Sequence, residues 1–154
     1  LRYGIEEIEN RYKITQRLAT IAMIHYGAGV IYKKHHGKIE KIYELREKIR
    51  NTALDKPENP RSRTIARMMD SLTVYVNNLT NVKRLNVSLF RTDYDYLGGV
   101  ARAVGSSVSS IVRLAMYISM LDEGMKIIEN PVQEFEISLD AMLEILGVLS
   151  KFLE

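Results

Sequence analysis

The most informative hydrophobic pattern of this chain lies in residues 83–115. Three apolar residues alternate there with three polar ones, in the order Arg84, Leu85, Asn86, Val87, Ser88 and Leu89. Such alternation is typical of a β-strand with one buried face. Two runs of apolar residues at helical spacing follow, and Gly105 separates them. The pattern therefore predicts a strand–helix–helix unit over residues 82–121.

Helical spacing of apolar residues predicts further helices over residues 4–26, 38–52 and 62–79 and in the tail beyond residue 139. Residues 30–34 are β-branched, aromatic and basic, with glycines before them and His35-His36-Gly37 after them, which favours a short strand. The tail also alternates, at Phe135, Ile137 and Leu139. The expected fold class is therefore mainly α with a short two-stranded antiparallel ribbon.

Local signals within residues 82–121 mark the ends of the two predicted helices. Thr92 and Asp95 have the spacing of a capping box at the start of the first helix. Gly105 is placed to end that helix as the C′ residue, where a left-handed backbone favours glycine. Ser107 is then the expected N-cap of the second helix. That helix start offers free N–H groups and a positive dipole, which suit a DNA phosphate.

These residues resemble the ribbon–helix–helix family of DNA-binding regulators over some 40 positions. Residues 83–89 match the family's ribbon, and residues 105–115 match its G-x-S-x-S-x-x-[IV]-R-x-A opening of the second helix. The resemblance implies a β-ribbon in the major groove and a backbone clamp at Ser106, Ser107 and Val108. Val108 departs from the pattern, because many members have Lys or Arg there, so the clamp would rely on backbone N–H groups.

The polar face of the predicted strand has the chemistry for contacts to DNA bases. Arg84 can donate to guanine O6 and N7, Asn86 can pair with adenine, and Ser88 can donate or accept. The alternative is an amphipathic edge strand whose Arg84 is only solvated.

A ribbon needs a second strand, and two sources are open. Residues 28–80 could form a degenerate first unit, with the strand at 30–34, as in the tandem ribbon–helix–helix regulators of archaeal viruses. The other source is a second copy of the chain, with 28–80 a plain helical domain. Residues 1–27 would then be an N-terminal helix and 132–154 a packing or oligomerisation segment. The expected phosphate-contacting cations are Lys33, Lys34, Arg61, Arg63 and Lys83.

Composition narrows the function further. The 154 residues are 46% hydrophobic and 27% charged, with a net charge of +3, which permits a nucleic-acid partner. The chain has no cysteine, which excludes disulfides and thiolate metal sites. No apolar run approaches the roughly 20 residues of a membrane span, and no signal peptide is visible. We therefore expect a cytoplasmic protein, in the host cytoplasm if it is viral, with no membrane partner.

The sequence offers no catalytic, metal or cofactor site. His25, His35 and His36 lack the spacing that would bring them to one ion. The leading hypothesis is a sequence-specific regulator of transcription, repressor or activator, that binds double-stranded DNA and self-associates. The alternative is a protein-interaction module, antitoxin-like, that uses the same unit only as a dimerisation core. An enzyme is not expected.

Overall fold

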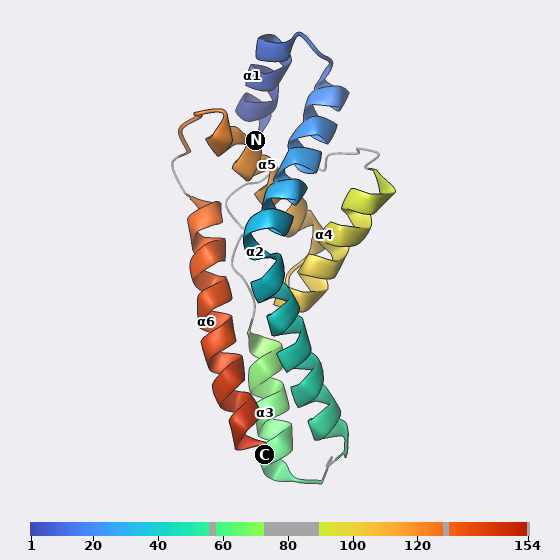
Figure 1. Ribbon diagram of the computed structural model, residues 1–154, viewed down its shortest axis with the longest axis vertical. Helices are drawn as coiled ribbons and strands as arrows, with labels where there is room; N and C mark the ends of the chain where they lie inside the picture. The colour runs from blue at the N-terminus through green and yellow to red at the C-terminus, as the bar shows by residue number, and fades with distance from the viewer. Residues whose placement is uncertain (56–57, 73–89, 128–129, 154) are drawn as a thin grey trace.

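One long helix organises the chain. A computed structural model describes residues 1–55, 58–72, 90–127 and 130–153, and within them it forms six helices. These are α1 (Arg2–Tyr12), α2 (Gln16–Asp55), α3 (Pro60–Ser71), α4 (Arg91–Val104), α5 (Val108–Asp122) and α6 (Pro131–Phe152). Helix α2 packs against each of the other five, with α4 and α6 on different sides of it and α3 along its C-terminal half (Figure 1).

Helix α5 is the most enclosed element. From Ser110 to Met120 every side chain is buried except those of Val112 and Arg113, which are half-buried. It crosses α2 at Gly27, where a Cβ atom would lie 2.0 Å from the carbonyl oxygen of Ala115. Next to this crossing, the Ser119 hydroxyl donates to the Met23 carbonyl over 2.5 Å. The two backbones therefore approach as closely as they do because residue 27 has no side chain.

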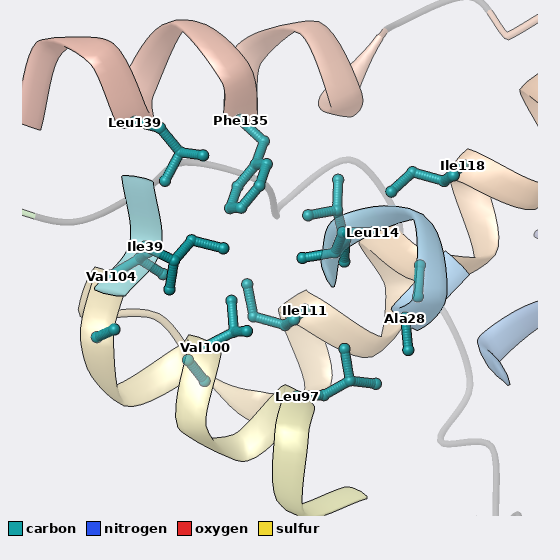
Figure 2. Close-up of a cluster of buried hydrophobic side chains, with 14 of the residues drawn as sticks. Ala28, Ile39, Leu97, Val100, Val104, Ile111, Leu114, Ile118, Phe135 and Leu139 are labelled. Atoms are coloured by element: carbon teal, nitrogen blue, oxygen red, sulfur yellow. The ribbon is translucent and has the colours of Figure 1, made fainter. Parts of the chain in front are cut away.

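The main core lies where α2, α4, α5 and α6 meet. Buried side chains from all four helices converge there, among them Ile39, Leu97, Ile111, Leu114 and Phe135 (Figure 2). Phe135 and Leu114 are each 0% exposed. Burying side chains of this size contributes about 1.5–3 kcal/mol each. The core thus joins α2 to α6, the last helix of the chain.

Two helices start in the same way, with an asparagine cap followed by proline. The Asn59 side chain accepts from the Arg61 amide at 2.9 Å, and the Asn130 side chain accepts from the Gln133 amide at 3.1 Å. Pro60 and Pro131 then occupy the first helical position, where a missing N–H costs nothing. Pro60 and Pro131, each after an asparagine cap, therefore mark the starts of α3 and α6.

The expected fold class is wrong. The described residues form an all-α protein of six helices, with no strand among them. The strand expected at 30–34 lies inside α2, which continues for 40 residues through the glycines and histidines that were expected to interrupt it. Only Ile31 of those five residues is fully buried, and its neighbours on the core face are Ala28 and His35, at helical spacing. Burial of Ile31 in the core and the contact of Tyr32 with Tyr96 of α4 indicate that tertiary packing overrides the β-propensity of the run.

Two local expectations near the tail and α4 are also wrong. The alternation at Phe135, Ile137 and Leu139 does not mark a strand: Phe135 and Leu139 share the buried face of α6, and Ile137 is 62% exposed. The capping box at Thr92 is absent, because α4 begins at Arg91 and Phe90 is its N-cap. Asp93 is instead hydrogen-bonded to His25 of α2, with 2.8 Å between Asp93 Oδ2 and His25 Nδ1.

The α4–α5 junction follows its sequence signals. Gly105 ends α4 with a φ of 75°, and Ser107 caps α5 by accepting from the Ser110 amide at 3.2 Å. The helices predicted on either side of Gly105 are thereby confirmed. The strand predicted before them, and residues 73–79 of the helix predicted over 62–79, lie outside the described residues.

The α2–α5 crossing gives a direct test. We expect Gly27→Ala to lower the free energy of unfolding by about 2–4 kcal/mol, because the new methyl group would overlap the Ala115 carbonyl. Gly37→Ala is the matched control: it lies in the same helix with open space around its Cβ, and should raise stability by about 0.5–1 kcal/mol. Urea unfolding followed by circular dichroism measures both. Equal effects at the two glycines would contradict the close crossing.

His35 gives the fold a predictable pH dependence. It is buried between α2 and α6, edge-on to Phe135, with Nε2 3.4 Å from Glu136. Burial lowers the pKa of His35 and outweighs the opposite effect of Glu136, while the positive charges of Lys38 and Lys34 lower that pKa further. The unfolded chain therefore binds the proton more readily, so the free energy of unfolding should fall as pH drops below about 6.5.

His35→Gln should remove part of this dependence. We expect the difference in unfolding free energy between about pH 7.5 and about pH 5.5 to be smaller in the variant than in the parent protein. Urea titrations at both pH values measure it. A stability that rises on acidification, or an identical pH dependence in the two proteins, would show that His35 is not buried in its neutral form.

Candidate nucleic-acid interface

The residues expected to contact DNA bases are not among those that the structure describes. Arg84, Asn86 and Ser88, together with Lys83, fall in residues 73–89. Their roles stay predictions from the sequence.

The first described residue after that segment is fixed against α2. Phe90 lies edge-on to His25, with 5.6 Å between ring centroids, and His25 also binds Asp93 in the first turn of α4. Asp93 is nearly buried, whereas the His25 side chain is 64% exposed. The chain therefore enters α4 beside residue 25 of α2, which is eight residues, or about 12 Å, before Lys33.

Lys33 and Lys34 lie on the outer, solvent-facing side of α2. Both are exposed, and the helix places Lys41 and Lys48 in line with Lys34, because residues seven apart in a helix return to nearly the same direction. The spacing along the axis is about 10.5 Å for each step. We call Lys33, Lys34, Lys41 and Lys48 the lysine row.

The charge distribution sets this face apart from α6. Helix α2 contains eight basic and four acidic residues, whereas α6 contains one basic and four acidic. Lys38, at the border between these helices, binds Asp140 with 2.6 Å between Nζ and Oδ1. Lys33, Lys34 and Lys41 form no ion pair with any residue that the structure describes, so their charges face solvent.

The junction of α4 and α5 uses part of the hydrogen-bonding capacity expected to clamp a phosphate. The Ser106 amide donates to the Ala101 carbonyl at 2.9 Å, and the Ser107 hydroxyl accepts from Ser110. The first turn of α5 still has the amides of Val108 and Ser109, which no helical carbonyl pairs. Val108 is half-buried and Ser109 is exposed.

Arg61 and Arg63 are far from Lys33 and Lys34, which were also predicted to contact phosphate. They lie in the first turn of α3, and the Arg61 guanidinium covers the Phe152 ring at 5.3 Å. Helix α3 begins just after α2 ends, so about 20 residues of α2, or about 30 Å, separate them from Lys33. The cations predicted to contact phosphate thus form separate groups and do not converge on one site.

The sequence did not point to the role of Arg46. It is 6% exposed, and its Nη2 donates to the Leu72 carbonyl at 2.5 Å, beside Gly105. Burial lowers the pKa of Arg46, although Asp70 opposes this effect. The residue connects α2 with the end of α3 and the α4–α5 turn, and is too enclosed to contact a phosphate.

Comparisons with protein-family models, with curated proteins and with solved structures find no match. In the described part of the chain, no single helix is long and apolar enough to cross a membrane. Helices α4 and α5, bent by 112° at their junction, meet that test only as a pair.

Proposed function

We propose that this protein binds double-stranded DNA and regulates transcription, with the lysine row of α2 on the phosphate backbone. The observation that carries the proposal is the exposed alignment of Lys34, Lys41 and Lys48 beside Lys33. DNA carries one negative charge per roughly 1.7 Å of helix axis, so successive lysines each meet a phosphate without a specific register. The row supplies affinity and orientation rather than sequence preference.

Sequence preference requires contacts to base edges. Arg84, Asn86 and Ser88 keep this proposed role because their chemistry, rather than any conformation, suggests it. Phe90, the residue that follows that segment in sequence, contacts His25 of α2, the helix that carries the lysine row. The two regions would then act together, one on the backbone and one on the bases.

The lysine row gives a specific prediction for salt dependence. We expect the double variant Lys34→Ala/Lys41→Ala to bind DNA more weakly and to lower the slope of log K against log salt by about 1.8, or 0.9 for each lost phosphate contact. Electrophoretic shifts or fluorescence anisotropy on a site chosen by random-sequence selection, at several salt concentrations, measure both quantities.

A charge-matched variant controls for the loss of net charge. Lys126→Ala/Lys151→Ala removes the same two charges from exposed positions in the α5–α6 connection and at the end of α6. This variant should keep a slope near that of the parent protein. If both variants lose the same affinity, the row acts only through net charge; if neither changes, the row does not contact DNA.

One observation favours a second function, the protein-interaction module. Helix α6 has exposed apolar side chains on its outer side, with Ile137, Ile145, Val148 and Phe152 between 41% and 62% exposed. They recur at helical spacing, as the contact face of an amphipathic helix does. If the same binding experiment retains no DNA at low salt, a protein partner on this face becomes the better explanation.

A further inference from the structure

A groove of about 400 Å³ lies between α2 and α4. Its walls are largely apolar, with Ile39 and Tyr43 from α2 facing Val100 and Ala103 from α4. Gly99 widens it, because a Cβ atom there would meet nothing within 4 Å. Apolar concavities of this size that carry a few polar groups are the usual form of small-molecule sites.

Carboxylates occupy both walls of this groove. Glu40 comes from α2 and Asp95 from α4, and their side chains are 62% and 67% exposed. Each has a basic side chain near it on its own helix, His36 for Glu40 and Arg91 for Asp95, but both contacts are 3.8 Å long, beyond hydrogen-bond distance. The carboxylates are thus free to bind an added donor.

Arg102 also lines the groove, at the other end of α4. It is seven residues beyond Asp95, or about 10.5 Å along the helix. A positive charge is therefore favoured near the two carboxylates and opposed near Arg102.

Aromatic rings lie beside Glu40 and Asp95. The rings of Tyr32, His36 and Tyr96 form one cluster, with centroids 4.5–6.1 Å apart. Tyr96 Oη and His36 Nδ1 are both buried and have no hydrogen-bond partner among the described residues. Burial raises the pKa of Tyr96 to about 12, so its hydroxyl stays neutral, and its oxygen can accept a hydrogen bond from an added donor. Unpaired buried polar atoms are costly, and two in one cluster point to a missing partner.

We propose that this groove binds a small organic cation, in which an ammonium group is attached to a flat apolar body. The ammonium lies between Glu40 and Asp95, where the ring faces also favour a cation. The apolar body occupies the space beside Gly99, between Ile39 and Val100. Glu40 directly precedes Lys41 in α2, so this site borders the lysine row, and it would make the protein responsive to an amine ligand.

Three indole compounds with different charges test the proposal. Tryptamine is a cation at neutral pH, indole-3-ethanol is neutral and indole-3-acetate is an anion. The protein has no tryptophan, so the fluorescence anisotropy of the indole reports binding directly when it is excited beyond the tyrosine band. We expect tryptamine to bind more tightly than indole-3-ethanol, and indole-3-acetate to bind most weakly. An equal or reversed order would overturn the proposal.

Variants locate the binding. Glu40→Gln and Asp95→Asn should each weaken the binding of tryptamine by about two- to fivefold, as expected for exposed charge pairs. The binding of indole-3-ethanol should be unchanged. Gly99→Leu should abolish binding of both compounds by filling the groove. Gly37→Leu, one residue from His36 but outside the groove, is the control and should change neither. Tryptamine binding that survives Gly99→Leu would place the site elsewhere. No DNA is present, so failure here leaves the DNA-binding proposal untouched.

Discussion

The close crossing of α2 and α5 at Gly27 fixes the arrangement of the remaining helices. At this point the backbone of α2 lies against the Ala115 carbonyl, and Ser119 adds a hydrogen bond to the Met23 carbonyl. With α5 held there, the Gly105 turn directs α4 along one side of α2, and the chain after α5 returns as α6 along another (Figure 1). The core of Figure 2 forms where these four helices meet.

The same arrangement determines which face of α2 stays in solvent. Helices α4, α5 and α6 pack against α2, and the exposed side chains of the lysine row lie on its outer side. The acidic residues of α6 lie next to this face, where Asp140 already binds Lys38. The groove with Glu40 and Asp95 opens on the side toward α4. The protein therefore carries a basic surface suited to a polyanion and, bordering it, a groove with two carboxylates suited to a small cation.

Sequence reasoning succeeded where the signal is local. The glycine after α4, the serine cap of α5 and the apolar spacing on both sides define that helix pair without reference to the rest of the fold. It failed where contacts between helices determine the local structure. The run at 30–34 has strand-forming residues, yet it lies inside α2, with Ile31 buried in the core and Tyr32 against Tyr96 of α4. From the sequence alone, Gly27 suggests the end of a helix. In the structure it lies inside α2, at the point where α5 crosses most closely.

The candidate site shows the same division. The sequence identified Lys33 and Lys34 as cations that could contact phosphate. Because they were assigned to a strand, where neighbouring side chains point to opposite faces, their alignment with Lys41 and Lys48 was missed. Once residues 16–55 are one helix, the seven-residue spacing is visible in the sequence itself. The groove could not be predicted, because Glu40 and Asp95 are 55 residues apart and only the packing of α4 on α2 brings them together.

The central claim is that α2 supplies, within one chain, the surface on which α5 is buried. Hydrogen–deuterium exchange measured by mass spectrometry at two protein concentrations that differ about a hundredfold tests it most directly. If α2 covers α5 in this way, amides from Ser110 to Met120 should be among the slowest to exchange, and their protection should be the same at both concentrations. Fast exchange in α5, or protection that appears only at the higher concentration, would contradict it and would show that another copy of the chain covers this helix.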